Sequence, residues 1–117
     1  MKILCLVYSS DDRWAELSDG EREAVIERYR DFSRNAAKAG KLVDGAQVQP
    51  ASTATTVRVR GGETLLTDGP FAETPEQLGR FFVLDCRSMD EALTLAATMP
   101  GAQHGTVEVR PAWGEGT

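Results

Sequence analysis

The sequence has little of the residue types on which metal and redox sites depend. Its 117 residues include one histidine and two cysteines, Cys5 and Cys86, with no CxxC spacing. One histidine cannot supply a usual zinc site, so a metal or redox role is disfavoured. Both cysteines lie inside apolar runs, and we expect them to be reduced thiols buried as small hydrophobic residues.

Clusters of positive charge and nucleotide-binding motifs are also missing. The chain has 13 Lys and Arg against 18 Asp and Glu, which gives a net charge of -5. Phosphate-backbone binding relies on clustered Lys and Arg, so direct nucleic-acid binding is disfavoured. The sequence contains no Walker loop and no G-x-G-x-x-G, G-x-S-x-G or H-E-x-x-H motif. We therefore expect no nucleotide or metal cofactor.

The N-terminal apolar run is too short for a membrane span or a signal-peptide core. Residues 3–8 are apolar, and Ser9-Ser10-Asp11-Asp12 follows at once. We expect a cytoplasmic protein that does not bind membranes.

A chain of 117 residues is enough for one domain and too short for two. We expect that domain at residues 1–113, followed by a flexible tail at residues 114–117.

Hydrophobic patterns predict six strands. Continuous apolar runs predict strands buried on both faces at residues 3–8 and 80–86. Weaker or alternating patterns predict the other four strands, at residues 42–48, 55–60, 63–67 and 106–110. Gly61-Gly62 predicts a two-residue hairpin turn, because glycine accepts the positive φ that such turns require.

Capping signals predict the helices. Ser18 and Glu21 have capping-box spacing ahead of an apolar stripe, which predicts a helix at about residues 19–39. Ser88 and Glu91 have the same spacing ahead of a second helix, which we expect Pro100-Gly101 to close.

Two shorter segments complete the prediction. Residues 74–77, Thr-Pro-Glu-Gln, again have capping-box spacing and predict about one helical turn, because Gly79 follows closely. The segment that carries Trp14 and Leu17 is predicted to be a loop.

The predicted order is β-α-β, hairpin, β-α-β, which is the α+β ferredoxin-like plan with an inserted hairpin. Two right-handed crossovers place both helices on one face of a single antiparallel sheet. The strands at residues 3–8 and 80–86 are apolar on both faces, so the helix-free face would be a large exposed apolar patch. A second copy is the simplest cover. We therefore predict a homodimer in which two sheets form a dimeric α+β barrel.

Polar residues near predicted strand ends are the candidates for chemistry. Asp68 is either a turn residue beside Gly69-Pro70 or a functional carboxylate. Glu73 either favours a helix start or is a functional carboxylate. His104 is either a surface loop residue or a proton-transfer group, since imidazole suits proton transfer near neutral pH.

The role of the charged residues in the last predicted strand depends on which face of that strand meets the helices. Glu108 and Arg110 alternate with Val107 and Val109. If the valines face the helices, the two charges point toward the partner sheet and must be well bonded or functional. If that face meets water, they are solvated charges. Tyr8 ends the first strand.

Residues 67–74, Thr-Asp-Gly-Pro-Phe-Ala-Glu-Thr, resemble the signature of the DGPF family, a branch of the YCII-related proteins. The similarity continues through residues 76–79 and Phe81, resumes at His104-Gly105 and residues 107–111, and covers nearly the whole chain. The sequence departs from the usual signature at Pro75, where lysine is common, and at Arg80, where glycine is common.

The resemblance implies a ferredoxin-like fold and a dimeric α+β barrel. Some YCII-related proteins are similar in fold to muconolactone isomerases, and one branch includes a dehydrochlorinase that acts on a hydroxylated aromatic. A His–Asp pair has been suggested as the catalytic unit of the wider group, and Asp68 and His104 are the nearest candidates here. Genes of the family often lie beside sigma-factor genes, which keeps a regulatory role open.

Two hypotheses follow. The first is a small-molecule isomerase or lyase in which Asp68 and His104 move a proton, while Arg80 or Arg110 holds an anionic group. The residues that we expect to contact its substrate are Tyr8, Phe71, Glu73, Arg80, Glu108 and Arg110. The second is a non-catalytic binding or regulatory module, with a sigma factor as a candidate partner. Convergence of Asp68, Glu73, His104 and Arg110 on one enclosed pocket would favour the enzyme, and scatter over the outer surface would favour the module.

Overall fold

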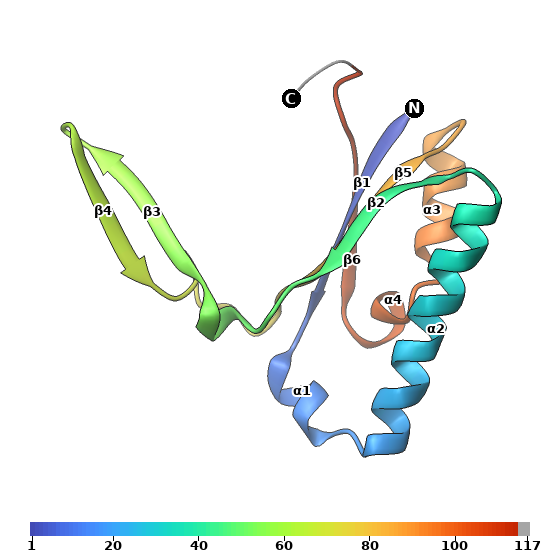
Figure 1. Ribbon diagram of the computed structural model, residues 1–117, viewed down its shortest axis with the longest axis horizontal. Helices are drawn as coiled ribbons and strands as arrows, with labels where there is room; N and C mark the ends of the chain where they lie inside the picture. The colour runs from blue at the N-terminus through green and yellow to red at the C-terminus, as the bar shows by residue number, and fades with distance from the viewer. Residues whose placement is uncertain (115–117) are drawn as a thin grey trace.

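The computed structural model describes residues 1–114, so residues 115–117 of the predicted tail lie outside the described residues. The described chain is an α+β domain with a four-stranded antiparallel sheet, a separate two-stranded hairpin and four α-helices (Figure 1). In chain order, its elements are β1 (Lys2–Ser9), α1 (Asp11–Glu16), α2 (Asp19–Lys38), β2 (Leu42–Gln47), the 3-10 helix η1 (Ala51–Thr53), β3 (Thr55–Arg60), β4 (Glu63–Asp68), β5 (Gln77–Asp85), α3 (Met89–Ala96), α4 (Pro100–His104) and β6 (Thr106–Pro111).

The four-stranded sheet has the order β2-β5-β1-β6, and each neighbouring pair is antiparallel. The two most apolar strands, β1 and β5, are central, where neighbouring strands cover both of their edges. β2 and β6 form the edges, so within one chain the sheet is open and does not close into a barrel. None of the helices in the described residues has the length and hydrophobicity that a membrane crossing requires.

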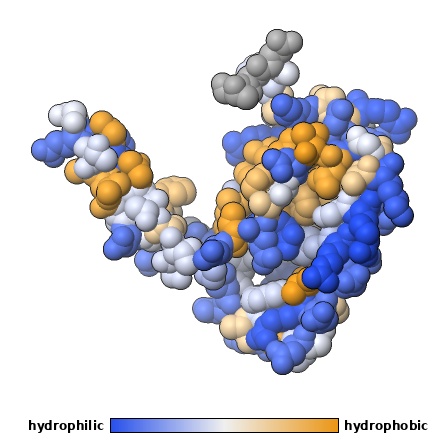
Figure 2. All heavy atoms as spheres, in the orientation of Figure 1, coloured by the Kyte–Doolittle hydropathy of each residue, from blue (hydrophilic) through white to orange (hydrophobic). Residues whose placement is uncertain are grey.

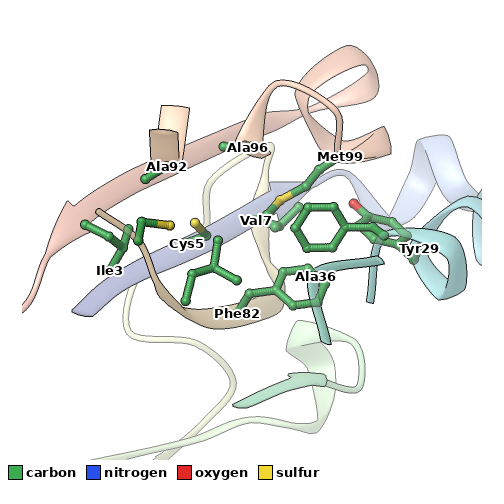
Figure 3. Packing of buried hydrophobic residues seen from close by; sticks show 12 residues of the cluster. Ile3, Cys5, Val7, Tyr29, Ala36, Phe82, Ala92, Ala96 and Met99 are labelled. Atoms are coloured by element: carbon green, nitrogen blue, oxygen red, sulfur yellow. The ribbon is translucent and has the colours of Figure 1, made fainter. Parts of the chain in front are cut away.

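The hydrophobic core lies between one face of this sheet and the helices (Figure 3). Because side chains alternate along a strand, Ile3, Cys5 and Leu84 point to this face, where all three are 0% exposed. Helices α2 and α3 cover them with the buried residues Tyr29, Phe32, Ala36, Ala92 and Ala96. Val107 and Val109 also pack against this core, so the first of the two alternatives for the last strand holds.

Both cysteines are free and buried, which confirms the sequence-based expectation. Burial raises the pKa of the Cys5 thiol to about 11. The thiol therefore stays protonated at neutral pH, and a protonated thiol is a poor nucleophile and metal ligand.

The capping box at the start of α2 is complete. The Glu21 N–H donates to the Ser18 hydroxyl at 3.1 Å, and the Ser18 N–H donates to the Glu21 carboxylate at 2.9 Å. Two N–H groups that would lack helical partners are thereby satisfied. The helix ends at Lys38, one residue before the predicted end.

At α3 only half of the predicted box forms. The Ser88 hydroxyl accepts from the Glu91 N–H at 3.2 Å. The Glu91 carboxylate instead accepts from the Lys41 ammonium at 2.5 Å and from the Arg87 guanidinium at 2.8 Å. Its side chain is 14% exposed, and these bonds lower its pKa to about 2. Glu91 thus ties the start of α3 to Lys41, which precedes β2.

This ion pair predicts a pH-dependent stability. Glu91→Gln should lower the thermal midpoint at pH 7, because the folded state then loses a bonded carboxylate. A carboxyl whose folded pKa is depressed stabilises the fold above its unfolded pKa and loses that effect as pH falls toward its folded pKa. The difference from wild type should therefore shrink between about pH 4.5 and about pH 2. Glu23→Gln, at an exposed site on α2, is the control. A difference that stays constant with pH would contradict this role.

Two segments predicted to be non-helical are helices. Residues 11–16 form α1, because Ser10 accepts from the Arg13 N–H at 3.2 Å and Asp11 and Asp12 lie in the first turn. The Arg22 side chain then donates to the Trp14 and Ala15 carbonyls, at 3.0 and 2.8 Å, at the end of this helix. Pro100 begins α4 instead of closing α3, since proline suits the first helical position.

The predicted helical turn at residues 74–77 is wrong. The Thr74 hydroxyl donates to the Glu76 carbonyl at 2.7 Å, and the Gln77 side-chain amide donates to the Ala72 carbonyl at 2.9 Å. These local bonds compete with a helical turn. Strand β5 begins directly afterwards, at Gln77, and not at residue 80 as predicted.

Strands β3 and β4 form the predicted hairpin, which projects away from the rest of the domain (Figure 1). The turn glycines, Gly61 and Gly62, have φ of 57° and 81°. The radius of gyration is 16.0 Å, whereas a compact chain of this length has about 13 Å.

Apolar side chains line this hairpin although it is surrounded by solvent in the single chain. Val57, Val59, Leu65 and Leu66 are 60, 58, 44 and 67% exposed. Figure 2 shows apolar residues along it and over strands of the main body.

The second face of the four-stranded sheet has no helix over it in the described chain. It presents the alternate residues of the central strands, which are Leu4, Leu6, Tyr8, Phe81 and Val83. The hairpin projects on this side of the sheet, opposite α2 and α3 (Figure 1). An apolar sheet face and an apolar hairpin thus lie on the same side of the molecule.

Candidate functional site

A cleft of about 490 Å³ opens at the end of the sheet where β1 finishes and β5 begins. This volume lies in the range of small-molecule binding sites. Helices α1, α2 and α4 and the chain after β2 form its other walls. It is lined by Val7, Ser9, Ser10, Asp11, Arg13, Trp14, Leu17, Val25, Ile26, Tyr29, Gln47, Val48, Gln49, Pro50, Gly79, Arg80, Pro100, Gly101, His104 and Gly105.

A β-bulge places Arg80 in this cleft. Val7 pairs with Arg80 and Tyr8 pairs with Leu78, so Gly79 has no partner residue on β1. Such an extra residue re-aims the side chains next to it. The Arg80 guanidinium lies over the Tyr29 ring, 4.0 Å from the ring centroid, and 6.0 Å from that of Phe82. Burial lowers the pKa of Arg80, although an arginine remains charged at any physiological pH.

Tyr29 forms the inner wall of the cleft. Its hydroxyl accepts from the Gly101 N–H at 2.9 Å, across the start of α4. Burial raises the pKa of Tyr29, so the phenol is neutral at physiological pH. A side chain at Gly101 would place its Cβ 2.4 Å from Val7 Cγ1 and 2.7 Å from the Tyr29 hydroxyl oxygen, so the close packing requires glycine. Figure 3 shows Val7, Tyr29 and Met99 together at this end of the core.

His104 is the last residue of α4 and lines the same cleft. Its backbone carbonyl accepts from the Arg13 guanidinium at 3.0 Å, which joins α1 to α4. Its exposed imidazole has no hydrogen bond to any residue of the described range. The ring is therefore accessible to a bound molecule or to water.

The signature segment lies outside the cleft lining. Asp68 ends β4 at the root of the hairpin, and its exposed carboxylate makes no hydrogen bond within residues 1–114. Phe71 is 81% exposed, and Glu73, two residues further on, is also exposed. Gly69, with φ of 99°, donates its N–H to the Ala54 carbonyl at 2.7 Å. The segment thus builds the junction between the hairpin and the main body.

The remaining predicted site residues lie on the helix-free face. Tyr8 pairs with Leu78 and Thr106 there. Glu108 and Arg110 lie on this face because their valine neighbours pack on the core, and Arg110 donates to Glu108 at 3.0 Å. Two of the eight predicted site residues, His104 and Arg80, therefore line the same cleft. The other six lie outside its lining.

Sequence reasoning missed three important residues of the cleft. Tyr29 was interpreted only as one apolar position of the helix predicted at residues 19–39, although its hydroxyl and its ring both contact other residues of the cleft. Arg13 and Trp14 were missed because residues 11–16 were predicted to be a loop. The signal that could have found them is Ser10, with two acidic residues after it, which favours a helix start.

The cleft combines two guanidinium groups, one carboxylate and one imidazole with an apolar wall. Such a mixture can bind a small organic molecule and exchange a proton with it. Fold and cleft together define a small α+β domain with a cavity beside its sheet.

Comparison with known proteins gives the family. The family model of the YCII-related domain matches residues 1–114. An uncharacterized protein of Rhizobium meliloti (strain 1021) is 40% identical over 111 residues, covering 93% of this chain and 88% of that protein. The chain therefore belongs to the YCII-related family, as the DGPF signature predicts.

Proposed function

We propose that the chain acts as a homodimer of ferredoxin-like subunits whose sheets pack into an α+β barrel. The strand order β2-β5-β1-β6 with helices on one face supports the ferredoxin-like plan. The uncovered apolar face supports the dimer, because soluble monomers rarely leave such a patch exposed. The hairpin gives independent support, since a two-stranded hairpin is marginally stable on its own. A second copy that covers both surfaces removes both problems.

Within this dimer, the cleft is the site of a small-molecule isomerase or lyase. The observation that carries the proposal is that His104 and Arg80 line one cleft of about 490 Å³ beside an apolar wall. His104 would accept a proton from substrate carbon. It would return that proton at another carbon in an isomerase, or give it to the leaving group in a lyase. A positioned general base of this kind contributes about 100-fold to 10,000-fold to a rate.

The test is a ligand screen followed by turnover. Small organic acids, lactones and hydroxylated aromatics are added one at a time, because a ligand that binds only the folded state raises the thermal midpoint. Val48→Trp is the matched control, since Val48 lines the cleft and is 39% exposed, so an indole there blocks the cleft and not the core. We expect ligands that stabilise wild type and not Val48→Trp. His104→Asn should retain binding and lose turnover. A screen without any cleft-dependent ligand would contradict the proposal.

Asp68 enters the proposal only through the dimer. The chain's own Asp68 is outside the cleft lining, but it lies at the root of the hairpin, on the side that faces the proposed partner. If Asp68 from either copy reaches His104, its charge favours the imidazolium. The titration midpoint of the single imidazole, followed by NMR, should then move to lower pH in Asp68→Asn. An unchanged midpoint would leave His104 as the proton-transfer group without Asp68.

A non-catalytic binding module is the second candidate. Two observations favour it. Asp68, Glu73 and Arg110 lie outside the cleft lining, and the His104 imidazole has no hydrogen-bonded acid in the described part of the chain. A bound ligand that is stable in the presence of wild-type protein, with no turnover, would favour this candidate. A sigma factor remains a proposed partner for it.

A further inference from the structure

Arg80 is presented to the cleft as an unpaired cation. Its side chain is half-buried, yet its guanidinium makes no hydrogen bond or ion pair with any residue between 1 and 114. None of its nitrogens is buried without a partner in that range, so its donors are open to solvent, and Arg80 is part of the cleft lining. A guanidinium carries five N–H donors in a planar fork that matches a carboxylate.

The position of that fork is fixed before any ligand arrives. The Tyr29 ring supports one face of the guanidinium at 4.0 Å. The Gly101 N–H in turn holds the Tyr29 hydroxyl at 2.9 Å. A stacked, supported arginine loses less conformational freedom on binding than a free one, which favours affinity.

Charge in the cleft differs in sign from charge in the whole protein. The chain has a net charge of -5. The cleft lining has Arg13 and Arg80 against the carboxylate of Asp11, with His104 as a further cation when protonated. Arg13 is already bonded to the His104 carbonyl, whereas Arg80 is not engaged in this way. The local field therefore favours an anion near Arg80.

The apolar residues of the lining favour a particular kind of group attached to the anionic group of the ligand. Trp14, Val25, Ile26 and Tyr29 provide aromatic and aliphatic surface in the same cleft. An apolar wall gains by covering a flat hydrocarbon surface, whereas a phosphate or sulfate would leave it bare.

We propose that Arg80 is the anchor for the carboxylate of a ligand with a flat apolar body, so that the substrates of this cleft are aromatic or cyclic carboxylic acids. This inference rests on the proposed function of the cleft and names its substrate class. Of the two arginines that the sequence suggested for an anionic group, Arg80 is therefore the one that we propose. The guanidinium of the other, Arg110, is paired with Glu108 on the helix-free face of the sheet.

The test compares benzoate with benzamide, which has the same shape and no charge. Calorimetric titration of wild-type protein should give tighter binding of benzoate by about tenfold, since a charge-assisted hydrogen bond contributes somewhat more than a neutral one. Arg80→Gln should remove that preference and leave benzamide binding unchanged. Arg80→Lys should retain part of it, because lysine keeps the charge and loses the fork.

Controls separate this inference from the proposed function. Arg28→Gln removes an exposed guanidinium outside the cleft lining and should leave both affinities unchanged. Thermal unfolding of each variant checks the fold. Equal binding of the two compounds in wild type and Arg80→Gln, lost in Val48→Trp, would overturn the carboxylate anchor and keep the cleft. No binding of benzoate to wild type would overturn the anchor directly, while the cleft would still be judged by the wider ligand screen.

Discussion

Gly105→Ala should lower the free energy of unfolding by about 3 kcal/mol, because overpacking at a closely packed site costs that order of energy. A Cβ at this position would lie 2.2 Å from the Tyr8 backbone oxygen. The neighbour is backbone, so no side-chain rotation relieves the clash, and the turn between α4 and β6 must move away from β1. Chemical denaturation followed by circular dichroism measures the change, and the thermal midpoint should fall by roughly 10 °C.

Gly20→Ala is the matched control. Gly20 lies in the first turn of α2, and a Cβ there would have no neighbour within 4 Å. Alanine restricts the unfolded chain and is a better helix former, so this variant should be as stable as wild type or more stable by up to about 1 kcal/mol. Equal stability of Gly105→Ala and wild type would mean that α4 does not pack on β1 as described. The arrangement of Gly101, His104 and Arg80 around the cleft would then also be in doubt.

Phe81→Asp should produce a folded monomer, whereas Phe82→Asp should unfold the chain. The two residues are neighbours in β5 but point to opposite faces of the sheet. Phe82 is 3% exposed in the core, where an unpaired carboxylate has no access to water. Phe81 lies on the helix-free face, so an aspartate there is solvated in a monomer and buried only in the proposed dimer. Burying an unpaired charge costs several kcal/mol, which weakens the dimer by about 100-fold or more.

Sedimentation at micromolar concentration distinguishes these outcomes. Wild type should sediment as a dimer, and Phe81→Asp and Val83→Asp as monomers with cooperative thermal unfolding. Thr94→Asp, at an exposed position of α3, is the control and should remain dimeric. A wild-type monomer would contradict the proposed assembly. A dimeric Phe81→Asp would show that copies meet elsewhere.

Strands and long helices were predictable from the sequence because their signals are local. Continuous apolar runs and weaker or alternating patterns indicated all six strands, and capping signals with apolar stripes indicated the two longer helices, α2 and α3. The short helices were not predictable in the same way. α1 and α4 have 6 and 5 residues, too few for a periodic stripe, and their stability comes from contacts with distant residues such as Arg22 and Tyr29.

The candidate site was predictable only in part, for a related reason. Nearness to a strand end indicated His104, which lines the cleft, but it also indicated Asp68, which ends a strand of the projecting hairpin. Strand ends meet only where strands share a sheet, and β4 pairs with β3 outside the main sheet. The alternation argument put Glu108 and Arg110 on the face opposite Val107 and Val109, where the structure has them. It could not relate them to the cleft, because a sequence does not show which face of the sheet contains a cleft.

The most direct measurement for the central claim, that the cleft is the ligand site, is an NMR map of ligand binding on isotope-labelled protein. Benzoate, or any hit of the ligand screen, is titrated while backbone amides and the single imidazole are followed. The account predicts shift changes at residues around the cleft, above all Gly101, His104 and Arg80, and their loss in Val48→Trp. Changes centred instead on residues 68–73, or on Glu108 and Arg110, would contradict it.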